Sequence, residues 1–373
     1  MRKLGLYIHI PFCLSRCNYC GFYSNAVGGE NEAELFVRES EYAAGVASTL
    51  KRQSRIYAHD RIVDTIYFGG GTPSILPEKL TGRLMDVIRH EFRISDDCEI
   101  TTEANPKTLT AGKLRFYKEI GINRLSIGLQ SYDTDVLSTL GRAHSPHDFE
   151  ESFMLARFAG FDNINCDIMF GVPGQSFESW IETVDRVIEL DPEHVSFYSL
   201  QLEEGTPLYE AYRQDKLPLL SDKVDRRMYH AAVRRFRKAG YDHYEISNAA
   251  KPGFECRHNL KYWSFDEYLG VGTSASSFMN GIRFTEGTRE EPHVNDFMDD
   301  AGEFVFTGLR KTCGISKKEF ADRFGRGFWD VYKEVRPKLK KYFDHGFLIE
   351  EGDNLRLSEK GIDRSNKIMS YFV

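Results

Sequence analysis

The sequence has little of what a membrane or secreted protein needs. No apolar run approaches the roughly 20 residues that a membrane-spanning helix requires. The apolar stretch Leu4 to Ile10 is interrupted by Tyr7 and His9 and leads directly into a cysteine cluster, so a signal peptide is not expected. We therefore expect a cytoplasmic protein without a membrane span, and peripheral association with a membrane stays open.

The sequence also lacks the paired cysteines of a disulfide framework. It has seven cysteines, an odd number, and three of them fall within eight residues. The other four are scattered along the chain: Cys98, Cys166, Cys256 and Cys313. This distribution favours metal binding in a reducing compartment over disulfide formation.

A surplus of positive charge is missing as well. The 373 residues carry a net charge of −7, which disfavours a broad nucleic-acid surface, and no nucleic-acid partner is expected. Residues 311–373 differ, with 14 Lys+Arg against 10 Asp+Glu. We expect this part to act as a substrate lid or a docking surface for a partner protein.

The pattern of apolar residues predicts an α/β fold. Buried strands alternate with amphipathic helices up to about residue 248, as in repeated βα units that form a parallel sheet and a whole or partial barrel. Caps are expected at Thr110, Ser145 and Ser176, and a first-turn proline at Pro77 and Pro146. The predicted strands are Leu4–Ile10, Thr65–Phe68, Glu99–Thr102, Arg124–Ile127, Asn165–Phe170, Val195–Leu200 and Tyr244–Ser247, and the predicted helices lie near 32–54, 77–92, 110–120, 147–160, 176–190 and 221–239.

The remainder of the chain divides into two parts. Residues 249–300 lose the regular alternation and are expected to be a linker with an insertion. Residues 301–373 predict a winged-helix-like α+β domain, with helices near 302–310, 316–323 and 327–343, a hairpin over Phe347–Leu357 and a terminal helix. The predicted division is thus 1–248, 249–300 and 301–373.

Cys13, Cys17 and Cys20 form a CxxxCxxC loop directly after the first strand. Three thiolates in one short loop can hold one face of a [4Fe–4S] cluster and leave one iron open to a ligand. A structural zinc site is a weaker alternative, because zinc ribbons bring a second cysteine pair that this sequence lacks.

This loop resembles the signature of the radical S-adenosylmethionine (radical SAM) superfamily. The resemblance implies that SAM chelates the open iron and that an electron from the cluster can cleave it, with a donor such as flavodoxin or ferredoxin if SAM is turned over. The fold implied is the radical SAM partial (β/α) barrel.

Polar residues at later strand ends extend the resemblance. Gly69-Gly70-Gly71-Thr72-Pro73 is similar to the family's GGGTP element, which meets the methionine amino group. The order of motifs resembles the coproporphyrinogen-dehydrogenase branch of the superfamily. This implies a SAM pocket that contains Tyr7, Tyr19, Gly70, Gly71, Thr72, Glu103, Gln130, Arg142 and Asp167.

Two features separate the members of that branch. The oxygen-independent coproporphyrinogen III dehydrogenases carry a further cysteine two positions after the third ligand, where this chain has Phe22, and they have a longer N-terminal arm. The segment Cys256 to Trp263 contains HNxxYW, which is similar to the mark of the branch's haem chaperones. The candidate haem residues are His258, Asn259, Tyr262 and Trp263. Cys256 is a second possible ligand as a thiolate, but a buried cysteine without a role in binding is favoured.

Three functions stay open at this point. The first is a chaperone that carries haem as cargo to recipient haemoproteins. The second is radical oxidative decarboxylation of a porphyrinogen propionate, and the third is a binding module with a structural cluster. A purely structural reading of HNxxYW also stays open, in which His258 and Asn259 hold the segment by hydrogen bonds and Trp263 packs in the core.

Overall fold

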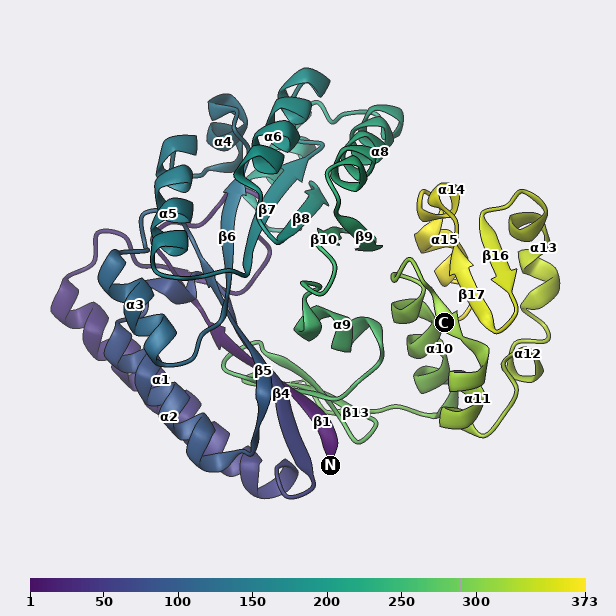
Figure 1. Cartoon of the computed structure of the whole chain (residues 1–373), viewed down its shortest axis with the longest axis horizontal. Helices are drawn as coiled ribbons and strands as arrows, with labels where there is room; N and C mark the ends of the chain where they lie inside the picture. The colour runs from purple at the N-terminus through teal and green to yellow at the C-terminus, as the bar shows by residue number, and fades with distance from the viewer. Residues whose placement is uncertain (289) are drawn as a thin grey trace.

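The computed structural model describes residues 1–288 and 290–373. Among them, twelve strands form one sheet in the order β14-β13-β12-β11-β1-β4-β5-β6-β7-β8-β10-β9 (Figure 1). Its centre is six neighbouring parallel strands: β1 (Arg2–Ile10), β4 (Arg61–Gly70), β5 (Ile94–Ala104), β6 (Arg124–Gln130), β7 (Ile164–Phe170) and β8 (His194–Ser199). Strands β14 and β9 stand at opposite ends of the order, so the described chain forms the partial barrel that the sequence predicts.

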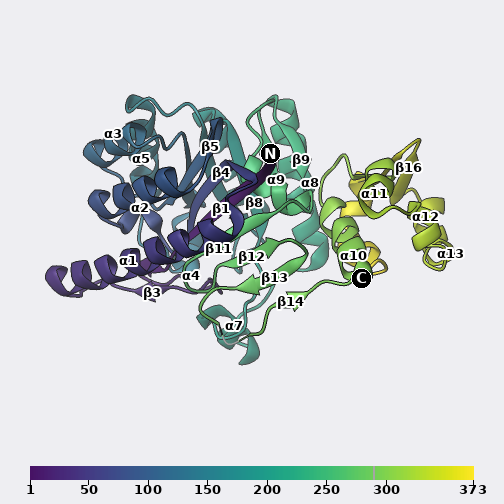
Figure 2. The same ribbon diagram turned by 90° about the horizontal axis from the view of Figure 1, so that it is seen from below.

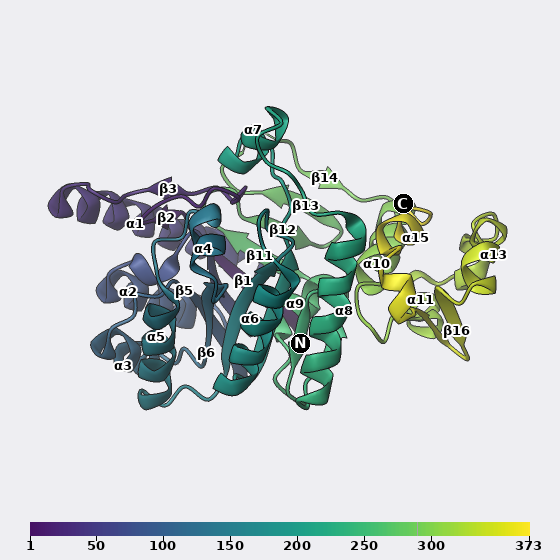
Figure 3. The same cartoon turned by 90° about the horizontal axis from the view of Figure 1, so that it is seen from above.

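Helices cover the outer side of the curved sheet, and the first α-helix extends beyond it (Figures 2 and 3). The strands are buried on both faces, as all seven residues of β6 show, and apolar residues on both faces are what a helix-covered parallel sheet needs. The helices are α1 (Glu32–Tyr57), α2 (Glu78–Glu91), α3 (Ala111–Glu119), α4 (Thr134–Leu140), α5 (Pro146–Phe158), α6 (Phe177–Leu190), α7 (Pro207–Arg213) and α8 (Asp222–Lys238), with a 3₁₀ turn at Pro73–Ile75.

The predicted caps are confirmed. The side chains of Thr110, Ser145 and Ser176 accept hydrogen bonds from amides in the first turns of α3, α5 and α6. Pro146 occupies the first turn of α5, whereas Pro77 falls at the N-cap of α2 rather than inside the helix.

The segment 249–300 is more regular than its composition predicts. It contains α9 (Arg257–Trp263) and strands that continue the sheet on the free edge of β1, with β11 parallel to β1 and the next three antiparallel. The strands at the two ends of the sheet are β9 (Asp242–Glu245), β10 (Asn248–Ala250), β11 (Tyr268–Val271), β12 (Ser276–Met279), β13 (Ile282–Thr285) and β14 (His293–Val294). These strands have two to four residues each, too few to give a periodic signal. Of the six, β11 pairs with β1, whereas β10 pairs with β8 at the other end of the sheet.

The C-terminal unit lies beside the barrel, next to α8 (Figure 3). The predicted hairpin is confirmed as β16 and β17, and β15 adds a third strand. The predicted helix at 327–343 is two helices, because Pro337 begins a new one in its first turn. The elements are α10 (Phe297–Gly308), β15 (Ile315–Ser316), α11 (Lys317–Phe324), α12 (Phe328–Val331), α13 (Arg336–Asp344), β16 (Leu348–Glu351), β17 (Asn354–Leu357), α14 (Glu359–Ile362) and α15 (Ser365–Met369).

No helix among the described residues is both long and apolar enough to cross a bilayer.

Candidate cofactor and ligand site

The cysteine loop follows the first strand and is held at both ends. Cys13 is the last residue of the short strand β2 (Phe12–Cys13), which pairs with β3 (Asn25–Ala26). Farther along, the amide of Asn18 donates to the Leu140 carbonyl (3.0 Å). Cys13, Cys17 and Cys20 are free, half-buried, and line one cavity.

Hydrogen-bond donors approach two of these sulfurs. Thr72 Oγ1 lies 3.6 Å from Cys13 Sγ, and Arg142 Nη1 lies 3.5 Å from Cys17 Sγ. A cationic donor stabilises a thiolate, which is the form that binds iron. Within the described residues no three His, Cys, Asp or Glu side chains converge as ligands of a single metal ion. Three thiolates in one loop can each bind a different iron of a cuboidal cluster.

The glycine run at the end of β4 lies against this loop. Gly70 has φ +111°, and a Cβ there would approach the His9 ring to 2.5 Å. A Cβ on Gly71 would lie 2.7 Å from the Phe12 carbonyl oxygen. The amides of Gly71 and Thr72 donate to the carbonyls of Ile10 and Phe12 (2.9 and 2.7 Å). Glycine is therefore required by close approach between the strand end and the cysteine loop.

Two carboxylates face the same cavity from β5 and β7, the strands on either side of β6. Glu103 accepts hydrogen bonds from the Tyr67 hydroxyl (2.8 Å) and the Gly70 amide (3.2 Å). Asp167 accepts from Ser126 Oγ (3.0 Å) and Asn165 Nδ2 (2.9 Å). Burial, together with the charge of Asp167, raises the pKa of Glu103 to about 7, and burial raises that of Asp167.

Gln130 and Arg142 complete this wall of the cavity. Gln130 ends β6 with φ +69°, beside an irregularity in the strand register, and such strain is concentrated at functional sites. Arg142 Nη2 donates to Asn105 Oδ1 (2.7 Å) and to the Gly128 carbonyl (3.0 Å), while its buried Nε has no partner among the described residues.

The two tyrosines expected in the SAM pocket differ in position. Tyr19 lines the cavity among the cysteines. Tyr7 lies inside the barrel, where its ring stacks on Tyr67 with centroids 6.2 Å apart and its hydroxyl shares a hydrogen bond with His9 Nδ1 (3.2 Å). Tyr7 is outside the cavity lining, and its contact with SAM stays a prediction.

The HNxxYW segment lies in α9, and only three of its four candidate haem residues reach the cavity. Asn259, Tyr262 and Trp263 line the cavity, whereas His258 is only 1% exposed. The two ring nitrogens of His258 share hydrogen bonds with Thr65 Oγ1 and the Tyr262 hydroxyl (both 2.8 Å). In this conformation His258 has no free nitrogen for an iron atom. The geometry favours the structural alternative, in which His258 holds Tyr262 in place.

Cys256 is also fully buried, and burial raises the pKa of its thiol to about 12. Its sulfur lies 3.8 Å from Glu99 Oε1. A thiol in this environment stays protonated, so the structure gives Cys256 no role as an iron ligand.

The cavity measures about 1220 Å³, larger than the 300–1,000 Å³ typical of a single small-molecule site. Besides the cysteine loop, the two carboxylates and α9, its lining includes residues that the sequence did not predict as site residues. These include Asn105, Ser126, Arg226, Glu245 and Arg310, together with residues 362–367 of the C-terminal unit. No local motif marks them, because they meet only through the fold.

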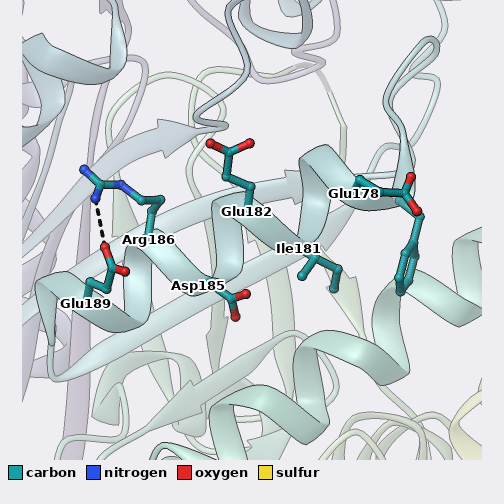
Figure 4. A pocket seen from close by; sticks show the side chains of 7 residues that line it. Glu178, Ile181, Glu182, Asp185, Arg186 and Glu189 are labelled. Atoms are coloured by element: carbon teal, nitrogen blue, oxygen red, sulfur yellow. Dashed lines mark hydrogen bonds and ion pairs between the residues drawn. The ribbon is translucent and has the colours of Figure 1, made fainter.

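A second hollow lies on the outer face of α6 (Figure 4). Its lining includes Glu178, Glu182, Asp185 and Glu189, and the only cation among its lining residues, Arg186, contacts Glu189 (2.8 Å). It contains none of the predicted site residues, so it is separate from the cavity described above.

The fold and this cavity define a radical SAM protein. The Radical SAM superfamily model matches residues 7–187, and the HemN C-terminal domain model matches residues 298–364. Over its full length the fold is similar to coproporphyrinogen III oxidase (HemN) from Escherichia coli, with a TM-score of 0.84, 22% identity and coverage of 100% of this chain and 90% of that one. The superfamily brings two cofactors, a [4Fe–4S] cluster and SAM.

Curated relatives narrow the class further. The heme chaperone HemW of Bacillus subtilis is 35% identical, covering 98% of both chains. The heme chaperone HemW of Escherichia coli is 34% identical, covering 99% of this chain and 98% of the relative. The chain belongs to the HemW family of the radical SAM superfamily.

Proposed function

We propose that the protein is a haem chaperone, which binds haem in the cavity beside a [4Fe–4S] cluster and SAM and delivers it to recipient haemoproteins. The observation that carries the proposal is the shared cavity. One space is lined by the three loop cysteines, by the strand-end carboxylates and by Asn259, Tyr262 and Trp263 of α9. Haem would thus lie within reach of the cofactors.

In this proposal the cluster is held by Cys13, Cys17 and Cys20. SAM lies against Gly70, Gly71 and Thr72 and contacts the polar side chains of Tyr19, Glu103, Gln130, Arg142 and Asp167, all of which line the cavity. When bound, the two cofactors supply one-electron chemistry. The chain's own residues bind and orient: Arg142 bridges the cysteine loop and β6, and Glu103 links the glycine run to Tyr67.

Haem would contact α9 through its flat apolar surface. Tyr262 and Trp263 offer aromatic area at the cavity wall, and Tyr262 packs edge to face on Tyr268 with ring centroids 4.6 Å apart. His258 contributes by fixing the Tyr262 hydroxyl.

Decarboxylation of a porphyrinogen is the competing function. Phe22 stands where the dehydrogenases carry their additional cysteine, and it is 69% exposed and lines the cavity. An exposed aromatic ring can contact a macrocycle but cannot replace a thiol, which supports the chaperone.

The proposal also names the compartment of the protein, its electron donor and the proteins that receive the haem. We place the protein in the cytoplasm, where its seven free cysteines stay reduced. An electron donor such as flavodoxin or ferredoxin would reduce the cluster if SAM is turned over, and haemoproteins are the recipients.

The deciding experiment is anaerobic and uses one preparation. After cluster reconstitution, haem binding is titrated optically, and coproporphyrinogen III decarboxylation and 5′-deoxyadenosine release are assayed in parallel. We expect stoichiometric haem binding without decarboxylation, and transfer of the bound haem to an apo-haemoprotein. Decarboxylation with 5′-deoxyadenosine release would instead establish a biosynthetic enzyme.

A further inference from the structure

The cavity has a second polar region where the C-terminal unit meets the sheet. Arg310, two residues after α10, and Trp263, the last residue of α9, both line it. The guanidinium carbon of Arg310 lies 4.3 Å from the centre of the Trp263 ring, a cation–π distance. The backbone that carries Arg310 is held in place, because the Arg310 carbonyl accepts a hydrogen bond from the Ile246 amide (3.1 Å) and Lys311 forms a β-bridge with Glu245.

This region gathers polar atoms that lack partners. Four are buried without a hydrogen bond among the described residues: Arg310 Nε, Trp263 Nε1, Glu245 Oε2 and Asn248 Oδ1. All four residues line the cavity. Buried polar atoms in native proteins are nearly always paired with protein, water or ligand, so such a group indicates a site for a polar ligand atom.

Arg310 is the main unsatisfied donor. Its ion-pair partner Glu245 lies 3.7 Å away, beyond hydrogen-bond distance. Burial raises the pKa of Glu245 to about 7, so this carboxyl compensates the guanidinium charge only in part near neutral pH. In the described part of the chain the Arg310 guanidinium makes no hydrogen bond, and its side chain is 25% exposed towards the cavity.

The two donors among these atoms indicate one part of the ligand, while the two acceptors, Glu245 Oε2 and Asn248 Oδ1, would pair with donors. The guanidinium and the Trp263 N–H are donors only, and a guanidinium fork matches a carboxylate with two oxygens. The indole face and Tyr262 provide apolar surface beside these donors. The site therefore suits a carboxylate attached to a flat, apolar body.

We propose that Arg310, supported by Trp263, binds a carboxylate of the ligand in the cavity. This inference rests on the proposed function, under which the carboxylate is a haem propionate. It gives the C-terminal unit a direct part in holding the cargo, because Arg310 belongs to the segment that links α10 to β15.

Arg226 provides a matched control. It also lines the cavity and its guanidinium carbon also lies over an aromatic ring, 4.7 Å from that of Tyr229. Two of its nitrogens are already engaged, because Nε and Nη2 both donate to Asp225 Oδ1 (2.9 and 2.5 Å). The two arginines thus differ mainly in whether the guanidinium is free to bind a ligand.

The test compares haem with haem dimethyl ester, in which both propionates are uncharged. Dissociation constants are measured anaerobically for the full chain with its cluster, for Arg310→Gln and for Arg226→Gln. Wild type should bind haem about tenfold to a hundredfold more tightly than the ester, the range of one charged hydrogen-bonded pair. Arg310→Gln should lose that preference while its affinity for the ester stays within about twofold, and Arg226→Gln should keep the preference.

The outcomes separate the two proposals. Failure of wild type to bind haem would overturn both the chaperone function and this site. Haem binding with equal affinity for the ester, or a haem affinity unchanged in Arg310→Gln, would overturn the carboxylate site alone. Arg310→Gln leaves Glu245 without its cation and could fail to fold for that reason. The double variant Arg310→Gln/Glu245→Gln then takes its place. The preference of the wild-type protein for haem over the ester tests the carboxylate site without any variant.

Discussion

The cysteine sulfurs differ in what surrounds them. The thiolates expected to bind the cluster lie in a loop that reaches the cavity, with Thr72 and Arg142 as donors to two sulfurs. Cys313, by contrast, is exposed and outside the cavity lining. The local donors and the cavity therefore separate the three thiols predicted to bind the cluster from Cys313.

Cys17→Ser should abolish cluster assembly, because a serine hydroxyl is a far weaker iron ligand than a thiolate and one ligand in three is lost. Iron and sulfide content and the visible absorption after anaerobic reconstitution measure this. Cys313→Ser is the control and should assemble the cluster as wild type does. Full iron and sulfide content in Cys17→Ser would refute the ligand assignment.

Glu103 should make the cofactor-free protein less stable as the pH rises. Its folded-state pKa of about 7 lies above 4.5, the ordinary value of a glutamate, so its contribution is fully favourable below 4.5 and is lost as the pH rises through 7. Glu103→Gln, which cannot ionise, should leave the free energy of unfolding nearly unchanged at pH 5. At pH 8 it should raise that free energy by up to about 3 kcal/mol.

Denaturant titration of the apo-protein at both pH values measures this effect. The same substitution at Glu182, an exposed residue of α6, serves as control. Equal stability of wild type and Glu103→Gln at pH 8 would contradict the environment described for Glu103.

At the scale of elements, α9 connects the barrel interior to the cavity. His258, on its buried side, bonds to Thr65 of β4, and Tyr262, one turn later, faces the cavity. The helix is also anchored at its start, where the amides of Arg257 and His258 donate to the Glu99 carboxylate (3.1 and 3.0 Å). This anchoring allows a buried side chain to affect ligand binding without touching the ligand.

His258→Ala should weaken haem binding and leave the cluster spectrum intact. It removes two hydrogen bonds and a buried ring, so the free energy of unfolding should fall by about 2–4 kcal/mol. Tyr262→Phe removes one of the same bonds and should weaken haem binding at a smaller cost in stability. Because His258 acts on haem through Tyr262, the haem absorption bands should keep their positions in His258→Ala. A spectrum that reports altered axial ligation would make His258 an iron ligand after all.

At the scale of the whole molecule, the C-terminal unit closes one side of the cavity. Residues 362–367 line it, and Asp363 contacts α8 through His230 Nε2 (2.9 Å) and Arg226 Nη1 (3.6 Å). These groups are partly exposed, so the contacts contribute only about 0–1 kcal/mol each to stability. Their position at the cavity makes them more important for ligand exchange than for folding.

Asp363→Asn should therefore change kinetics more than stability. We expect haem transfer to apomyoglobin, followed by stopped-flow absorption, to become several-fold faster, while the free energy of unfolding changes by less than about 1 kcal/mol. Asp322→Asn, on α11 and outside the cavity lining, is a suitable control. An unchanged transfer rate would show that this contact does not limit release.

The sequence by itself determined the features that depend on short stretches of chain. The CxxxCxxC loop, the glycine run, the caps of α3, α5 and α6 and the hairpin β16–β17 each follow from a few adjacent residues, and strand ends of a parallel barrel necessarily share one edge. That was enough to predict the α/β fold and to bring Glu103, Gln130 and Asp167 together.

Only the tertiary structure decided which face each residue of α9 presents. The HNxxYW motif does not show whether His258 points into the cavity or into the barrel. Its orientation depends on the hydrogen bond to Thr65, which lies 193 positions away in sequence. In the same way β11 to β14 are too short to be periodic and exist because β1 offers them an edge, and Arg310 meets Trp263 only where the C-terminal unit packs on the sheet. Burial and hydrogen-bond pairing are set by distant neighbours, and no local pattern carries that information.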